Sequence, residues 1–268
     1  MLDSFIHRIL RVPYTLHVRH NRRSKRPRAT YVFIHGLGNS SGAWDEVIHK
    51  LPDDVRVVTI DLLGFGQSPR PQWAVYDAKT QARSVIATLL KLRSSTPLTI
   101  VGHSLGALVA IEMALRYPLL VKKLFLCSPP LYDVPSRGLP RSDNLLRQLY
   151  STAEKRQDHF LRLASFAMKY NLVNTSFNVT EHNISSYMAA LNTMIINQTS
   201  LNDAHRLNVP TLIIRGTLDP FIVSKNLSRL SKENKNVTIK PIIAGHEIRG
   251  RYTKQLIEII TSDRQDKV

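Results

Sequence analysis

The segment Leu98–Gly106 reads Leu-Thr-Ile-Val-Gly-His-Ser-Leu-Gly, and it decides the fold of this chain. Its first four residues are a short apolar run with β-branched side chains, as a buried strand requires, and an apolar helical pattern begins near Ala107. A serine between two glycines, with a strand before it and a helix after it, is typical of a nucleophile elbow, a sharp turn that exposes the serine hydroxyl. The small Gly102 and Gly106 allow the close backbone approach that such a turn needs. This segment therefore predicts Ser104 as a nucleophile.

Six short apolar runs, each followed by a longer segment, predict a mostly parallel sheet whose two faces are both covered. They are Tyr31–Ile34, Val57–Ile60, Leu98–Val101, Lys123–Cys127, Thr211–Ile214 and Val237–Ile239. Apolar stripes at helical spacing lie between and after them, for example Ala82, Val85, Ile86 and Leu89. An alternating stretch at 14–19 predicts an additional edge strand in a hairpin, and residues 1–12 predict a short amphipathic helix. We expect an α/β fold.

Residues 131–207 lie between the fourth and fifth runs and contain no clear strand. Helical spacings occur there at Phe160–Tyr170 and at Tyr187–Ile195. A structureless loop of this length is uncommon in a compact domain. We therefore expect a core domain formed by residues 1–130 and 208–268, with a helical cap inserted at 131–207 whose side chains pack together and line a substrate pocket.

A serine hydroxyl needs a base within hydrogen-bond reach and an acid that orients this base. Asp219 follows the Thr211–Ile214 run, and His246 follows the last run in the sequence Ala-Gly-His. The chain order Ser104, Asp219, His246 is that of one class of serine hydrolases and differs from the orders of the others. The attack also needs two donors for the developing oxyanion, and we expect the backbone amides of Leu105 and Leu37 to supply them.

These motifs resemble the α/β-hydrolase superfamily, and the resemblance extends from about Tyr14 to Ile260. It rests on His35–Gly38, Asp61–Ser68, Gly102–Gly106, the turn at Asp219, and Gly245-His246. The resemblance implies a capped, cofactor-independent hydrolase of carboxylic esters, with small or medium acyl esters, lactones or thioesters as substrates. In such enzymes the serine forms an acyl-enzyme that water later cleaves.

Two other functions remain open at this stage. Carbon-carbon hydrolases of ring-fission pathways also use a serine under a helical cap, although they usually carry an asparagine where this chain has His103. The second alternative is a binding protein built on a hydrolase scaffold. Its motivation is the net charge of +17, from 37 basic and 20 acidic residues, which would suit nucleic acid, an acidic protein or an anionic surface.

Composition limits the remaining classes. No apolar run reaches the roughly 18 residues that a membrane span needs, so we expect no transmembrane segment. The single cysteine, Cys127, allows no disulfide within the chain, and we expect a cytoplasmic protein. No metal-ligand motif or dinucleotide fingerprint is present, so we expect neither a metal nor another cofactor. The oligomeric state is not predictable from these patterns.

Overall fold

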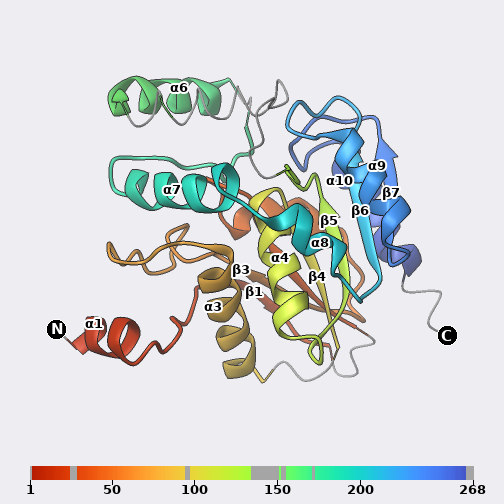
Figure 1. Ribbon diagram of the computed structural model, residues 1–268, viewed down its shortest axis with the longest axis horizontal. Helices are drawn as coiled ribbons and strands as arrows, with labels where there is room; N and C mark the ends of the chain where they lie inside the picture. Colours follow the sequence, from red (N-terminus) through yellow and green to blue (C-terminus); the bar gives the residue numbers. More distant parts are fainter. Residues whose placement is uncertain are drawn as a thin grey trace.

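The computed structural model describes residues 2–24, 29–93, 97–133, 151, 155–170 and 173–263. At the centre of these ranges lies a seven-stranded sheet with the order β1-β3-β2-β4-β5-β6-β7 (Figure 1). Its strands are β1 Val18–Arg22, β2 Thr30–Ile34, β3 Arg56–Ile60, β4 Leu98–His103, β5 Val121–Cys127, β6 Thr211–Gly216 and β7 Val237–Ile242. Strands β2 to β7 pair in parallel, which confirms all six predicted runs.

The predicted hairpin at the start of the chain is wrong. β1 pairs antiparallel with β3, from Val18 opposite Ile60 to Arg22 opposite Val57, and not with β2, its neighbour in sequence. β3 offers the free edge at this side of the sheet, because both edges of β2 are already paired with β3 and β4. The antiparallel strand covers that edge and leaves the parallel order of the other six strands intact.

Helices cover both faces of the sheet (Figure 1). The sheet separates two apolar clusters, one on each face. One face packs against α3 (Ala78–Lys91), α4 (Leu105–Arg116), α8 (Ser200–His205) and α9 (Ser224–Glu233). The other face packs against η2 (Ser41–Trp44), α2 (Asp45–Lys50) and α10 (Arg251–Asp263). The predicted stripes, which also include Leu90 on α3 and Leu115 on α4, are largely buried, but Leu90 is exposed and Leu115 is only partly buried.

An inserted helical region at 157–205 lies between β5 and β6. It contains α6 (Gln157–Lys169), α7 (Ile184–Ala190), the π-helix η3 (Leu191–Ile196) and α8. Much of the first half of the cap expected at 131–207, including residues 134–150, lies outside the described residues. Figure 1 shows α6 as the outermost of these helices, lying above α7 and away from the sheet.

At the other end of the chain, α1 (Leu2–Ser4) and the π-helix η1 (Phe5–Ile9) form the short N-terminal helix that the sequence predicts. Its apolar side chains Phe5 and Ile9 are exposed, so they do not form the buried stripe of a packed amphipathic helix. None of the helices within the described ranges combines the length and the apolar character needed to cross a bilayer.

Candidate active site

Ser104 occupies the sharp turn between β4 and α4. Its backbone has φ 51° and ψ −119°, a conformation that a residue with a side chain rarely adopts and that stores strain of about 1–3 kcal/mol. Two hydrogen bonds hold the turn: the Ser104 amide donates to the Cys127 carbonyl at 2.9 Å, and the Ala107 amide donates to the Ser104 carbonyl at 2.9 Å. The turn leaves the Ser104 side chain partly exposed.

The two glycines of the elbow are required by the packing around it. A Cβ on Gly102 would lie 2.4 Å from the Gly106 carbonyl oxygen, and a Cβ on Gly106 would lie 2.3 Å from the Ile34 carbonyl oxygen. These contacts bring α4 close to β2 as well as to β4. The sequence pattern therefore reflects a steric condition, and it places the start of α4 beside the loop that follows β2.

Asp219 and His246 meet, as the sequence predicts for an acid and the base that it orients. His246 Nδ1 lies 2.8 Å from Asp219 Oδ2, and Phe221 donates its amide to the other carboxylate oxygen at 2.9 Å. Burial alone would raise the pKa of Asp219, but the contacts with His246, the Phe221 amide and Ser128 outweigh burial and lower it. The Asp219 side chain is fully buried, whereas that of His246 is 16% exposed. The carboxylate is thus shielded from solvent while the imidazole remains accessible.

His103 lies beside His246, with their ring centroids 5.0 Å apart. The Nε2 of His103 donates to the His246 backbone carbonyl at 2.9 Å. Burial, together with the nearby His246, lowers the pKa of His103 to about 3, so the ring is neutral at physiological pH. This contact connects the elbow to the loop that carries His246, a connection that the sequence pattern does not indicate.

The loop after β2 lies beside the elbow. His35 shapes it from within: Nδ1 donates to the Gly36 carbonyl at 2.8 Å, and Nε2 accepts the Leu62 amide at 2.9 Å. Burial lowers the pKa of His35, which favours this neutral form. A Cβ on Gly36 would lie 3.2 Å from Ser104 Cβ, so the backbone leading to Leu37 passes close to the serine. Both ring nitrogens of His35 are thus occupied in holding this loop.

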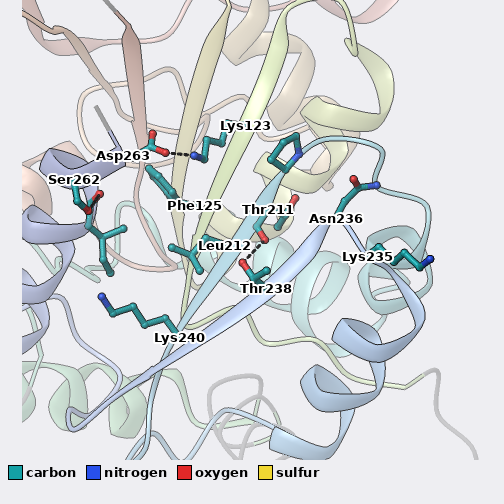
Figure 2. Close-up of a pocket in the computed structure, with 12 residues that line it drawn as sticks. Lys123, Phe125, Thr211, Leu212, Lys235, Asn236, Thr238, Lys240, Ser262 and Asp263 are labelled. Carbon is teal, nitrogen blue, oxygen red and sulfur yellow. Dashed lines mark hydrogen bonds and ion pairs between the residues drawn. The ribbon is translucent and has the colours of Figure 1, made fainter. Parts of the chain in front are cut away.

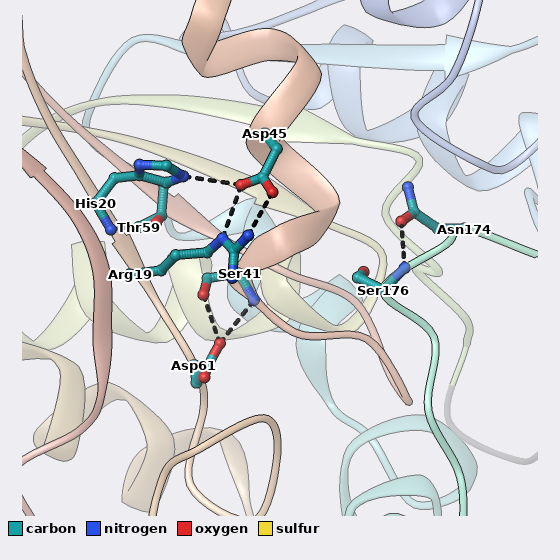
Figure 3. Close-up of polar contacts among 8 residues, drawn as sticks. All are labelled: Arg19, His20, Ser41, Asp45, Thr59, Asp61, Asn174 and Ser176. Carbon is teal, nitrogen blue, oxygen red and sulfur yellow. Dashed lines mark hydrogen bonds and ion pairs between the residues drawn. The ribbon is translucent and has the colours of Figure 1, made fainter.

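Asp61 connects the segments that carry Ser41 and Gln67 through hydrogen bonds, and Figure 3 shows those with Ser41. One carboxylate oxygen accepts the amide and the hydroxyl of Ser41 at 2.7 and 2.6 Å, and the other accepts the Gln67 amide at 2.8 Å. Burial would raise the pKa of Asp61, but these hydrogen bonds hold it below the usual value. Gly66 has φ +52° and a Cβ there would collide with the Asp61 carboxylate, which explains the glycine at that position.

A cavity of about 470 Å³ lies between the inserted helices and the elbow. Ser104, His246 and Leu37 all line it, so the structure brings these predicted residues to one space. The remaining wall is mainly apolar and aromatic, with side chains from both predicted cap segments: Tyr132, Phe160, Leu163, Ala164, Phe166, Ala167, Val173, Phe177, Tyr187, Leu191, Ile195 and Phe221. Glu247, directly after His246, also lines the cavity, and the sequence analysis does not identify it.

A second cavity, also about 470 Å³, lies at the opposite end of the sheet, where β5, β6 and β7 begin (Figure 2). Lys123, Lys235 and Lys240 line it, and Lys123 forms an ion pair with Asp263. It contains none of the predicted catalytic residues. Ligands of open parallel sheets bind at the carboxyl ends of the strands, which favours the Ser104 cavity as the active site.

Among the residues that the structure describes, no three His, Cys, Asp or Glu side chains are grouped closely enough to hold a metal ion. The candidate site consists of the elbow, the His246–Asp219 pair and the adjoining backbone amides. The groups present can supply a nucleophile, a base and hydrogen-bond donors.

Comparison with known proteins gives a consistent picture of the fold. A family profile described as the alpha/beta hydrolase fold matches residues 31–248. The solved enol-lactonase of Burkholderia xenovorans LB400 superposes with a TM-score of 0.77 at 18% identity, covering 95% of this chain and all of that one. An esterase of Thermogutta terrifontis gives a TM-score of 0.73 at 18% identity, covering 94% and 93% of the two chains.

Curated relatives match over shorter stretches. The probable lysophospholipase BODYGUARD 4 of Arabidopsis thaliana is 34% identical over 114 residues, which is 42% of this chain and 27% of the relative. The probable lysophospholipase BODYGUARD 2 of the same plant is 30% identical over 131 residues, which is 47% of this chain and 28% of the relative. The matched stretches are thus about a quarter of the length of these relatives.

Proposed function

Because the chain belongs to the α/β hydrolase family over residues 31–248, we propose that it is a serine hydrolase of carboxylic esters. Ser104 is its nucleophile, His246 its general base and Asp219 the acid that orients His246. The observation that carries the proposal is the 2.8 Å contact between His246 Nδ1 and Asp219 Oδ2, at the wall of a cavity that Ser104 also lines. The substrates are small or medium acyl esters, and lactones and thioesters share the same chemistry.

The proposed reaction has two stages, acylation of Ser104 and hydrolysis of the acyl-enzyme. Ser104 Oγ attacks the ester carbonyl carbon, and its proton passes to His246 Nε2 while Nδ1–H remains hydrogen-bonded to Asp219. His246 then protonates the leaving alcohol, and the ester C–O bond breaks to leave an acyl group on Ser104. Water, deprotonated by His246, cleaves this acyl-enzyme, and Ser104 regains its proton.

The backbone amides of Leu37 and Leu105 are the proposed oxyanion donors. Leu105 is the first residue of α4, where the helix has no earlier carbonyl to accept its amide hydrogen. Leu37 lies in the loop that the elbow contacts through Gly36, and it lines the cavity. One such donor is worth about 3–4 kcal/mol of transition-state stabilisation in well-studied enzymes.

The position of the cavity, between the inserted helices and the elbow, supports the proposal of an acyl-binding pocket. We assign residues 1–130 and 208–268 to a hydrolase core and 131–207 to a cap. The apolar wall of the cavity would bury an acyl chain, and a binding volume of this size is usual for small-molecule sites. The names of the plant relatives, probable lysophospholipases, add support for esters with one acyl chain.

A fluorophosphonate probe tests the assignment directly. We expect it to label the wild-type protein and not the Ser104→Ala variant, and equal labelling of both would refute it. His246→Ala should reduce the turnover of a p-nitrophenyl ester by roughly several hundred-fold or more, because the general base is lost. Undiminished turnover in that variant would mean that another group acts as the base.

A further inference from the structure

Glu247 is the one carboxyl group among the described residues that line the Ser104 cavity. It follows His246 in the chain, so the same loop that presents the base also presents this acid. No lysine or arginine is among the described residues of the cavity wall. The described cavity wall therefore holds a single carboxyl group and no basic side chain of lysine or arginine, in a protein whose net charge is +17.

One oxygen of this carboxyl group, Oε2, is buried and has no hydrogen-bond partner in the described part of the chain. Burial raises the pKa of Glu247, and the nearby His246, Arg249 and Asn174 amide only partly offset the effect, while Asp219 adds to it. Because Oε2 is shielded from water, a charge on this carboxyl group is screened less than a charge at the surface.

Aromatic rings form much of the wall around the same space. Phe177 and Tyr187 both lie against Gly38 of the loop after β2, and a Cβ on this glycine would be 2.4 and 3.1 Å from their rings. Phe221 packs edge-on against His246 with ring centroids 4.9 Å apart. Aromatic faces together with a carboxylate favour a weakly hydrated organic cation, such as a quaternary ammonium group.

We propose that the cavity selects esters that carry an organic cation, with an ammonium group held between the Glu247 carboxylate and the aromatic wall. This inference rests on the proposed esterase function and narrows its substrate class. Glu247 is the carboxyl-bearing residue of the cavity wall, and its negative charge would attract the ammonium group electrostatically. Glu247 acts here as a specificity residue, because it takes no part in the bond-making steps at Ser104.

A pair of substrates with equal shape and different charge tests this proposal. Butyrylcholine carries a trimethylammonium group, and 3,3-dimethylbutyl butyrate carries an uncharged tert-butyl group in its place. We expect the wild-type kcat/KM to be about tenfold higher for the choline ester, the preference that roughly 1.4 kcal/mol of cation binding provides. In Glu247→Gln this ratio should fall to about one.

Glu258→Gln is the matched control, because Glu258 lies on α10 and contacts Gln255 outside the cavity, so its substrate ratio should equal that of the wild type. An unchanged ratio in Glu247→Gln, or no wild-type preference for the choline ester, would overturn the proposal.

Calorimetry on Ser104→Ala separates failure of this inference from failure of the esterase proposal. Choline should bind to Ser104→Ala and bind at least about fivefold more weakly once Glu247→Gln is added. Absence of choline binding would refute the cation site even if both esters are hydrolysed. Binding without any hydrolysis would leave the cation site intact and refute the esterase function instead.

Discussion

The contact between Asp219 and His246 sets which imidazole nitrogen carries the proton. The carboxylate accepts from Nδ1, which leaves Nε2 as the nitrogen that takes the proton of Ser104 in the proposed mechanism. An amide in place of the carboxylate would present its N–H to Nδ1 and reverse this preference. We therefore predict that Asp219→Asn lowers kcat by about 10³- to 10⁴-fold, as an inverted tautomer does in other triads, with little change in KM.

Steady-state kinetics with a p-nitrophenyl ester would measure this effect. Asp133→Asn is a suitable control, since Asp133 is an exposed acid that pairs with Arg229. If Asp219→Asn kept more than about a tenth of the wild-type kcat, Asp219 would not be the orienting acid.

The depressed pKa of Asp61 gives a second prediction, on stability. A carboxylate whose pKa is lower in the folded than in the unfolded state stabilises the fold above its unfolded pKa, near 4, and loses this contribution as the pH falls through the folded value. Asp61→Asn should therefore cost about 3 kcal/mol of unfolding free energy near neutral pH. The difference from wild type should narrow below about pH 4, where the wild-type carboxylate also loses its charge.

Urea unfolding at several pH values would measure the difference. Asp45→Asn provides the comparison, because Asp45 pairs with Arg19 and His20 at the surface and its side chain is 31% exposed. Its loss should cost less than about 1 kcal/mol and should shrink in high salt. If the loss of unfolding free energy in Asp61→Asn did not depend on pH, the charge of Asp61 would contribute nothing to stability.

At the scale of elements, the elbow depends on the distance between α4 and β2. A Cβ at Gly106 would lie 2.3 and 2.6 Å from the carbonyl oxygens of Ile34 and His35, and these backbone atoms cannot rotate away as a side chain can. We predict that Gly106→Ala destabilises the fold by about 3 kcal/mol or more, or prevents folding.

Gly245→Ala is the matched control, because a Cβ there would meet nothing within 4 Å although the residue precedes His246. Its unfolding free energy should stay within about 1 kcal/mol of wild type. Equal denaturation midpoints for both variants would show that α4 and β2 can move apart at no cost in unfolding free energy.

The same elements show what the sequence can predict. Runs such as Tyr31–Ile34 are apolar and buried throughout because both faces of the sheet are covered, so short continuous runs of this kind predict the six parallel strands. The partner of β1 was missed, since alternation at 14–19 indicates a half-buried strand but not the edge to which it pairs. Motif spacing predicted Ser104, Asp219 and His246 together. Glu247 carries no motif of its own, because its place in the cavity wall depends on residues of the inserted helical region that are distant in the chain.

At the scale of the whole molecule, the charge outside the active site and the charge inside it have opposite signs. The net charge of +17 produces a positive field in the surrounding water, whereas Glu247 places one acid in an aromatic cavity. Fields in water decay over about 10 Å at 0.1 M salt, while contacts inside a cavity are screened much less. Salt should therefore change how charged substrates approach and leave the contact with Glu247 largely in place.

We predict that raising the salt concentration from about 20 to 500 mM leaves kcat/KM for a neutral butyrate ester nearly constant, raises it at least about twofold for butyrylcholine, and lowers it for an ester bearing a carboxylate. The far field repels the cationic ester and attracts the anionic one, and screening removes both effects. Initial rates at low substrate concentration measure these values, with sodium and potassium chloride compared to exclude an ion-specific effect. Parallel changes for all three esters would mean that salt acts on the fold and not on approach. Tight nucleic-acid binding that weakens about 10³-fold between 50 and 200 mM salt, without fluorophosphonate labelling, would instead favour a basic binding protein built on this scaffold.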